Sequence, residues 1–385
     1  MRFPEFSGEW NKYTINDLAT VVGGGTPDTT VKSYWGEDIQ WFTPSEIGKN
    51  KYVDFSKRTI TRDGLDNSSA KLLPLHTILL SSRATVGECS IASNECTTNQ
   101  GFQSLIAKQC NIDFLYYLIQ TKKKDLIRNA CGSTFLEISA NEIRKIKVAV
   151  PVQNEQEQIA KLLSLIDERI ATQNKIIYKL KSLIKGLVDE LMTVLLKGKL
   201  YPFSSFYIKA GEGGTPTTSV VEYYTEGTIP FIKIEDLSCK YLTNNKDFIT
   251  ELGMQKSSAW LIPSKSVIYS NGATIGAISI NEYPVCTKQG ILGIVPNTNI
   301  NVEYLYLLMS SSYFSKEISR IITEGTMKTA YLKDINHIKC PLPSMAQQKN
   351  ITNLTSSIEE KLSIEQELLR FLNLQKQYLL HMIFI

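Results

Sequence analysis

Two long stretches of the chain, which begin after Pro151 and Pro343, carry apolar residues at steps that alternate between four and three. This spacing is typical of the a and d positions of a coiled coil. Each stretch spans about 40 residues, roughly 60 Å of helix, which is too long for one small domain to cover. The pattern therefore predicts two long helices that pair with each other. The two stripes are Ile159, Leu163, Ile166, Ile170, Gln173, Ile177, Leu180, Ile184, Leu187, Leu191 and Val194, then Ile351, Thr355, Ile358, Leu362, Glu365, Leu369, Leu372, Lys376, Leu379 and Ile383.

Polar residues at the start of both stretches have the spacing of helix caps. Asn154 is followed three residues later by Glu157, and Ser344 is followed by Gln347. In such a pair the first side chain accepts a hydrogen bond from an amide of the first turn. Both helices are therefore expected to begin just after the prolines.

The rest of the chain has a different pattern, with short β-rich runs separated by Gly, Pro, Asn and Ser turns. Residues 76–80 and 267–269 are two such runs. The pattern predicts α+β globular domains rather than further long helices. Four segments follow from this change of pattern: a domain over residues 1–150, a helix over 151–198, a domain over 199–343 and a helix over 344–385.

The chain also contains an internal duplication. The repeated segments occur in the same order, at an offset that grows only from 189 to 192 residues, which favours a tandem duplication over chance matches. A duplicated chain that folds back on itself would make the helix pair antiparallel and the molecule pseudo-twofold symmetric. Residues 24–27, 74–87, 99–101 and 143–151 return as residues 213–216, 263–276, 288–290 and 335–343.

Composition narrows the class of protein. The net charge is only +4, and the seven cysteines include no C-x-x-C pair, unlike a zinc ribbon or a secreted disulfide framework. Three scattered histidines offer little for a metal site. The first residues do not resemble a signal peptide, and no stretch reaches the roughly 18 apolar residues of a membrane helix. We expect a cytoplasmic protein with reduced, buried cysteines.

Catalytic motifs are missing from the sequence. It contains no G-x-x-x-x-G-K-[ST] loop, and no two adjacent prolines, which an adenine methyltransferase tetrapeptide requires. Pro27-Asp28 is not followed within about 30 residues by the D/E-x-K of a metal-dependent nuclease. The run Gly23-Gly24-Gly25 leads into Thr-Pro rather than a helix, so a tight turn with positive φ is expected there instead of a phosphate loop. The sequence predicts no catalytic site, no metal and no cofactor in this chain.

Two related but different globular domains are suited to binding a linear ligand with two unequal sites, such as duplex DNA. Polar side chains in the repeated loops provide donors and acceptors for base edges, although each is equally suited to forming a turn or capping a helix. Lys122 to Lys124, Arg144, Lys145, Lys147 and Lys328 have the charge to neutralise phosphates, or form solvated faces. The candidate base-contacting residues are Thr26, Arg83, Thr85, Asn99 and Gln100 in the first half and Thr215, Lys233, Asn271, Thr274, Lys288 and Gln289 in the second.

An ordered series of motifs precedes each long helix and occurs twice over the whole chain. In the first half it reads GGTP, YW-x-x-x-I-x-W, SSRATVG, TNQG, a Gly132-Ser133-Thr134 loop, IRKIKVAVP and Q-x-E-Q-x-I. This series resembles the specificity subunit of type I restriction-modification systems. The resemblance adds Thr134 to the DNA-binding candidates. It implies two target-recognition domains that each read half of a bipartite, asymmetric DNA site, and helices that set the unread spacer.

The resemblance also implies partners and cofactors. The helices would dock two modification (methyltransferase) subunits, and restriction (motor and nuclease) subunits would join the complex. S-adenosylmethionine, ATP and Mg would be bound by those partners and not by this chain.

Two other functions remain open at this stage. One is a two-headed protein-binding scaffold whose coiled coil is the functional surface, without DNA recognition, and the other is a degenerate nuclease. A steep fall of DNA affinity with salt would favour the DNA-binding hypothesis over the scaffold. The sequence specifies neither the DNA target nor the spacer length.

Overall fold

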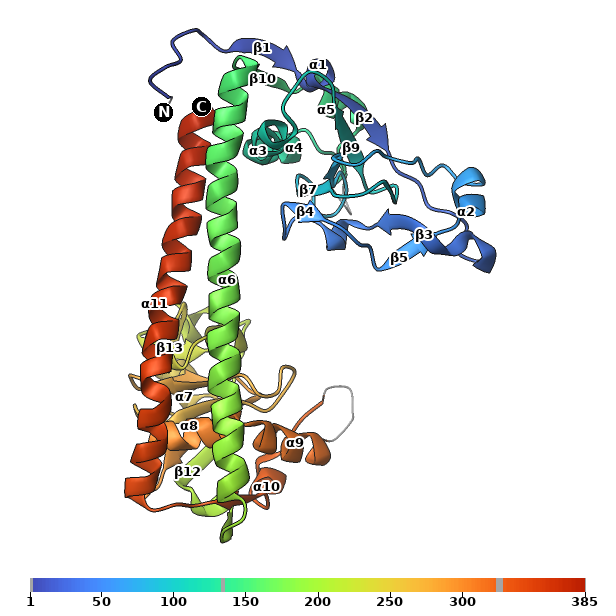
Figure 1. The fold of residues 1–385 in the computed structure, drawn as a ribbon. Helices are drawn as coiled ribbons and strands as arrows, with labels where there is room; N and C mark the ends of the chain where they lie inside the picture. The colour runs from blue at the N-terminus through green and yellow to red at the C-terminus, as the bar shows by residue number, and fades with distance from the viewer. Residues whose placement is uncertain (1–2, 133–135, 323–327, 385) are drawn as a thin grey trace. The chain divides into compact units, whose positions relative to one another are not determined.

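The computed structural model describes residues 3–132, 136–322 and 328–384. Contacts divide the chain into two units, the first made of Met1–Asn174 with Glu367–Ile385 and the second of Lys175–Gln366. Each unit contains one globular part, which we call its head, and one half of each long helix (Figure 1). This division cuts the helices in the middle, whereas the boundaries expected from sequence separate helices from heads.

The head of unit 1 is built on a five-stranded mixed sheet. Its strands are β1 (Asn11–Thr14), β2 (Ala19–Gly23), β3 (Trp35–Phe42), β4 (Tyr52–Val53), β5 (Arg58–Ile60), β6 (Ile78–Leu80), β7 (Cys89–Ala92), β8 (Cys96–Thr98), β9 (Gln103–Ala107) and β10 (Lys147–Val150). The five-stranded sheet has the order β2-β9-β6-β7-β4, beside a three-stranded sheet β5-β3-β8 and the pair β1-β10. Both faces of β6 are buried, which explains why this strand shows a continuous apolar run instead of alternation.

Short helices cover this sheet. They are α1 (Ile15–Leu18), α2 (Arg62–Asp66), α3 (Ile112–Thr121), α4 (Lys123–Arg128) and α5 (Ala140–Lys145), with 3₁₀ turns at Lys32–Tyr34 and Pro44–Glu46. Helix α3 begins where the Asn111 side chain accepts a hydrogen bond from the Phe114 amide, and it buries six consecutive residues, Phe114 to Ile119. It therefore lies inside the unit, with β7 on one side and the long helices on the other.

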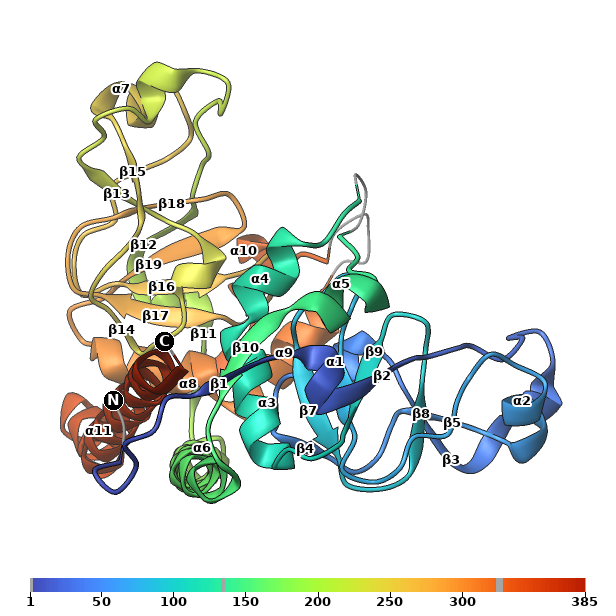
Figure 2. The same cartoon turned by 90° about the horizontal axis from the view of Figure 1, so that it is seen from above.

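The head of unit 2 has the same construction. Its strands are β11 (Leu200–Pro202), β12 (Tyr207–Glu212), β13 (Ile229–Ile232), β14 (Tyr241–Leu242), β15 (Asp247–Ile249), β16 (Val267–Ser270), β17 (Ile278–Asn281), β18 (Cys286–Thr287), β19 (Ile291–Pro296) and β20 (Lys339–Pro341). Its helices are α7 (Glu251–Gln255), α8 (Val302–Ser310), α9 (Ser312–Ile321) and α10 (Leu332–Ile335), with 3₁₀ turns at Phe203–Ser205, Val221–Tyr223 and Ile234–Asp236. The three-stranded sheet and α7 lie beyond the five-stranded sheet as seen from α8 (Figure 2).

Strand order confirms the duplication and the α+β class predicted from sequence. The five-stranded sheet of unit 2, β12-β19-β16-β17-β14, repeats the order of unit 1 element by element, including one parallel pair at its edge. The three-stranded sheets and the two-stranded pairs also correspond.

The long helices are α6 (Gln153–Leu195) and α11 (Met345–Phe384). The expected cap of α11 is present, since the Ser344 amide donates to the Gln347 side chain and the Gln347 amide to Ser344 Oγ. The expected Asn154 cap is wrong, because α6 begins one residue before it, at Gln153. The amides of Glu155 and Gln156 donate to the Val152 carbonyl, so Asn154 already lies within the first turn.

Within each unit the two helices run antiparallel, as predicted. In unit 1 the first half of α6 lies against the second half of α11: Ile159, Leu163 and Ile166 share a core with Leu379 and Ile383. In unit 2 the second half of α6 packs in the same core as the beginning of α11, through Val188, Met192 and Ile351. The same cores contain the sheet and α3 or α8, so each head is continuous with its helix pair.

Burial along the helices follows most of the predicted stripe. The exceptions lie at the end of α6, where Val194 is 62% exposed and Val188 and Met192 are buried instead. In a straight helix of 3.6 residues per turn, a 3.5-residue repeat gradually rotates around the helix. Near the end of α6 the face that carries Val188 and Met192 therefore packs into the apolar core of the head. Val194 is therefore not a pairing residue. The other predicted positions are buried or partly buried: Ile159, Leu163, Ile166, Ile170, Gln173, Ile177, Leu180, Ile184, Leu187, Leu191, Ile351, Thr355, Ile358, Leu362, Glu365, Leu369, Leu372, Lys376, Leu379 and Ile383.

A buried glutamine holds the start of each long helix to its head. Gln156 donates from Nε2 to the Pro151 carbonyl and accepts the Asn111 amide at Oε1, at 3.0 Å each. Gln348 repeats the arrangement, with the Pro343 and Asn299 carbonyls and the Asn301 amide. Because Asn111 and Asn301 cap α3 and α8, the glutamine links two helix starts in each unit.

All seven cysteines are free, but they are not all buried. Cys131 and Cys239 are exposed, which corrects the expectation from sequence. Burial raises the pKa of the Cys96 and Cys110 thiols to about 12, so these side chains behave as small apolar residues. None of the described helices is long and apolar enough to cross a membrane.

Candidate nucleic-acid interface

Four loops that are far apart in the sequence meet in the head of unit 1. The Gly25 amide donates to the Thr98 carbonyl and the Ser82 amide to the Gly101 carbonyl, both at 2.8 Å, while the Ile138 amide donates to Ser82 at 2.9 Å. These bonds bring the GGTP, SSRATVG and TNQG motifs together with the segment that precedes α5. We call residues 24–28, 81–87, 98–102 and 136–138 the loop cluster of unit 1.

The same loops meet in unit 2. The Gly213 amide donates to the Ile291 carbonyl, the Asn271 amide to Gly290, and the Ala330 amide to Asn271, at 2.8 to 3.0 Å. The Gln289 amide also donates to Thr215 Oγ1 at 3.4 Å. Residues 213–217, 270–276, 287–291 and 328–330 are the loop cluster of unit 2.

The glycines of the GGTP motifs serve close packing and not positive φ. Neither Gly23, Gly24 nor Gly25 is among the glycines with positive φ, so the turn expected from sequence is wrong. A Cβ on Gly24 would lie 2.0 Å from the Asn99 carbonyl oxygen, and one on Gly213 would lie 2.1 Å from that of Thr287. The motif therefore lets the TNQG strand end approach the GGTP backbone directly.

Replacing Gly24 by alanine is expected to destabilise unit 1 by roughly 1–3 kcal/mol, because the new methyl group would overlap backbone that cannot move aside. Thermal unfolding followed by calorimetry measures the effect. The matched control is Gly8→Ala, where a Cβ meets nothing within 4 Å and a change below about 0.5 kcal/mol is expected. Equal stability of both variants would show that the loop cluster is loosely packed.

Most of the predicted DNA-binding side chains lie at the surface of the two clusters. Arg83, Thr85, Gln100, Thr274, Lys288, Gln289 and Lys328 are exposed, and Thr26, Asn99, Thr215 and Lys233 are partly exposed. Thr134 lies outside the described residues. The structure thus gathers candidates from separate motifs on each head.

Several of these side chains also hold the loops in place. Thr26 Oγ1 donates to Gln100 Oε1, and Asn99 Oδ1 accepts the Gly101 amide at 2.9 Å. Thr85 Oγ1 lies 3.0 Å from Ser81 Oγ. A substitution at Thr26, Gln100 or Asn99 would therefore disturb the loop as well as its surface.

Asn271 differs from the other candidates because it is only 1% exposed. Its Nδ2 donates to the Ala330 carbonyl at 3.1 Å, and its backbone bonds Gly290 and Ala330. This placement gives Asn271 a supporting role in the cluster and leaves little surface for contact with a base.

Two of the charged candidates, Arg83 and Lys233, lie beside acids. Lys233 pairs with Asp247 at 2.9 Å, and the hydrogen bond from this carboxylate raises the lysine pKa above its usual value. Arg83 Nε lies 3.8 Å from Glu137, with both side chains about half exposed, so this pair is weak. Both cations remain available to an anionic ligand that displaces the acid.

Three residues of the phosphate-binding runs expected from sequence make contacts within the head. Lys123 pairs with Glu88, and Lys145 with Glu142 at 2.8 Å. Arg144 donates to the Val21 carbonyl at 3.2 Å. Lys124 and Lys147 are exposed and Lys122 is partly exposed.

Arg58 is a surface residue that the sequence analysis missed. Its guanidinium carbon lies 3.6 Å from the centre of the Trp35 ring, which packs edge-on against Trp41 at 5.0 Å. Stacking on an aromatic ring orders a cation at low entropic cost. The duplication gives the signal that was overlooked: the position of Arg58 is taken by Asp247 in unit 2, so the heads differ in charge there.

The described residues contain no group of three or more His, Cys, Asp or Glu side chains that could hold a metal ion. The two loop clusters present backbone amides, hydroxyl groups, side-chain amides and a few cations. This chemistry is suited to binding a polar, anionic surface.

Comparisons with known proteins agree with this geometry. Residues 7–182 and 206–373 each match the type I restriction modification DNA specificity domain. The type I restriction enzyme MjaIX specificity subunit of Methanocaldococcus jannaschii is 28% identical, over 92% of this chain and 88% of its own length.

Two solved structures have the same fold. The type I restriction-modification S subunit of M. genitalium aligns with a TM-score of 0.55 at 18% identity, over 100% of this chain and 99% of its own. A chain from a structure concerned with assembly and conformational transition of a type I system aligns with a TM-score of 0.57 at 14% identity, over 98% of both chains.

Proposed function

Since the chain belongs to the family of type I restriction-modification DNA specificity proteins, we propose that its two loop clusters each read one half of a bipartite, asymmetric DNA target. Members of this family are DNA-recognition subunits and not the catalytic subunits of the enzyme. The same membership bears out the resemblance that the order of motifs indicated.

One observation carries the proposal: the same loop framework is built twice and presents different side chains. Thr26 and Thr85 recur as Thr215 and Thr274, but Arg83 is replaced by Gly272 and Asn99 by Lys288. Hydrogen-bonding groups at base edges specify sequence, so different groups on one framework read different sequences. A target with two unlike halves is the expected result.

The outward faces of the long helices support a role in binding partner proteins. Beside the buried stripe, several large apolar side chains are exposed by about half or more and leave apolar surface that a partner protein would cover. We infer that two modification subunits dock there and that restriction subunits join the complex. Partners would supply S-adenosylmethionine, ATP and Mg. The exposed residues are Leu165, Phe371, Leu374 and Tyr378 in unit 1 and Tyr178, Leu183, Leu354 and Ile364 in unit 2.

Binding and methylation measurements test this function. With a modification subunit present, the complex is expected to methylate one bipartite sequence in a host methylome, and the isolated chain is expected to transfer no methyl group. Affinity for the methylated sequence should fall steeply with salt, with a slope of about −0.9 per phosphate contacted.

The alternative is a protein-binding scaffold that does not recognise DNA. It predicts salt-independent or absent DNA binding together with a stable complex with partners. Methylation by the isolated chain, or methylation without a defined target, would also contradict the proposal.

A further inference from the structure

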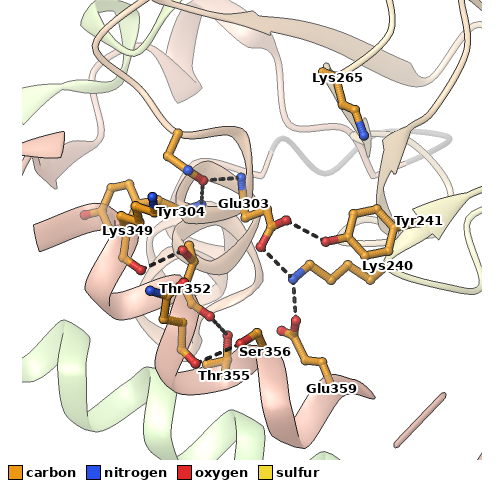
Figure 3. Close-up of polar contacts among 12 residues, drawn as sticks. Lys240, Tyr241, Lys265, Glu303, Tyr304, Lys349, Thr352, Thr355, Ser356 and Glu359 are labelled. Atoms are coloured by element: carbon orange, nitrogen blue, oxygen red, sulfur yellow. Dashed lines mark hydrogen bonds and ion pairs between the residues drawn. The ribbon is translucent and has the colours of Figure 1, made fainter. Parts of the chain in front are cut away.

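A lysine at the edge of the five-stranded sheet connects the head of unit 2 to α11. Lys240 Nζ lies 3.4 Å from Glu303 Oε2 on α8 and donates to Glu359 on α11 (Figure 3). The neighbouring Tyr241 hydroxyl donates to the other Glu303 oxygen at 2.7 Å. The Lys240 side chain is only 12% exposed and that of Glu359 17%. One cation thus joins a strand, a short helix and a long helix.

The corresponding lysine of unit 1 makes the same connection to α6. Lys51 Nζ lies 2.7 Å from Asp113 on α3 and 2.6 Å from Ser164 Oγ on α6, and its side chain is 10% exposed. The Tyr52 hydroxyl donates to Asp113 at 2.8 Å. We call Lys51, Tyr52, Asp113 and Ser164 the clamp of unit 1, and Lys240, Tyr241, Glu303 and Glu359 the clamp of unit 2.

The clamp differs from the apolar core beside it because its interactions are directional, and not because they add much stability. Apolar side chains pack with little preference for angle, whereas charge-assisted hydrogen bonds are short and directional. Partly buried ion pairs lose much of their Coulombic gain to desolvation and are poor sources of net stability. Burial, with the Glu303 carboxylate as a further cause, raises the pKa of Tyr241 above its usual value, so the hydroxyl stays protonated and keeps donating.

The two units also differ in the polar contacts that lie beside their clamps. In unit 1, Tyr117 donates to Asp167 on α6 at 2.7 Å, and Asp167 pairs with Lys376 on α11 at 2.7 Å, so the second long helix also joins the network. The duplication aligns Asp167 with Glu359 and Lys376 with Ile184. An isoleucine cannot pair with Glu359, so unit 2 lacks this contact.

We propose that Lys51 and Lys240 are positioning residues that fix the angle of each head on its long helix, and so restrict the spacing at which the two half-sites are read. Other polar contacts support both clamps: Tyr117 donates to Asp167 on α6 in unit 1, and Ser312 on α9 donates to Asp189 on α6 in unit 2. This inference rests on the proposed function for its DNA consequence, but not for its mechanical part.

The mechanical part is measured in the free full-length chain. Spin labels on Lys256→Cys in the head and Glu360→Cys on α11 report the distance distribution inside unit 2, in a background where the exposed Cys131 and Cys239 are serine. Labels on Lys71→Cys and Arg169→Cys report unit 1. Lys240→Met should broaden the unit 2 distribution, and Lys51→Met should broaden that of unit 1.

The DNA consequence is measured with the modification subunit present. Lys240→Met should raise methylation of sites whose spacer is one base pair longer or shorter by roughly tenfold relative to the cognate spacer, with both half-sites unchanged. Lys240→Arg keeps the charge and should restore spacer selectivity. The matched control is Lys265→Met, which removes a 61% exposed lysine that pairs with Glu282 in the same head, away from the helices (Figure 3).

Glu359→Met distinguishes loss of the clamp from a folding defect of the head. It removes the contact of Lys240 with α11 and leaves Lys240 paired with Glu303 inside the head. It should broaden the distribution and relax the spacer as Lys240→Met does. Unchanged distributions and spacer selectivity in both variants would overturn the clamp. A broadened distribution in a chain whose wild type methylates no bipartite site would instead overturn the proposed function and leave the clamp standing.

Discussion

A chimera that carries a relative's first head in place of residues 1–150 is expected to change one half of the methylated sequence completely and to leave the other half and the spacer unchanged. The hydrogen bonds that shape the loop cluster of unit 1 all lie within the head. The head packs on its helices through the apolar core that it shares with Ile159, Leu163 and Leu379, and through polar contacts such as Gln156 with Asn111 and Lys51 with Ser164. A donor head that keeps this apolar face, together with Lys51 and Asn111, should therefore dock without adjusting the helices.

Methylome sequencing of a host that expresses the chimera with its modification subunit measures the outcome. The reciprocal exchange of residues 199–343 is the matched control and should change only the other half. If either exchange altered both halves together, the heads would not read independently, and the assignment of one half-site to each loop cluster would fail.

Insertions near Thr172, an exposed position in α6, are expected to distinguish two effects. One is a rotation of the apolar stripe of the helix, and the other is a change in the length of the helix. Two added residues rotate the following helix by about 200°, which turns its apolar stripe to solvent and should abolish assembly with the modification subunit. Four added residues rotate it by only about 40° beyond a full turn and lengthen it by about 6 Å. A coiled coil absorbs such a four-residue stutter by local unwinding.

The four-residue variant should therefore either methylate the same half-sites at a spacer longer by roughly two base-pair steps or lose modification. Size-exclusion chromatography of the complexes and methylome maps of both variants provide the measurements. A four-residue variant that still modified the original site at the original spacer would show that the helices dock partners without setting the spacer.

Features that depend on periodicity or repetition were predictable from the sequence. The stripe from Ile159 to Ile177 predicted the helix pair, and the repeated motifs at Gly24 and Gly213 predicted the duplicated heads. Both predictions use only the spacing and order of residues along the chain, which folding does not change. Val194 was mispredicted, since the helix drift and the competing core around Met192 depend on tertiary packing.

Features that depend on close approach between distant segments were not predictable in the same way. Nothing local in the GGTP motif indicates that Gly24 faces the Asn99 carbonyl, so a turn with positive φ was the expectation. Lys51 and Lys240 belong to no motif. Their signal is the repeated Lys-Tyr pair at an offset of 189, whose meaning depends on Ser164 and Glu359 more than 100 residues away.

The composition of unit 1 has a consequence for the order in which the chain folds during synthesis. Its core includes Leu379 and Ile383, which are made about 200 residues after Ile166. At 5 to 20 residues per second, the ribosome takes roughly 10 to 40 s to supply them. During that interval the apolar face of α6 lacks the residues of α11 that later cover it. At this stage of synthesis the incomplete first unit is exposed to aggregation or to capture by a chaperone.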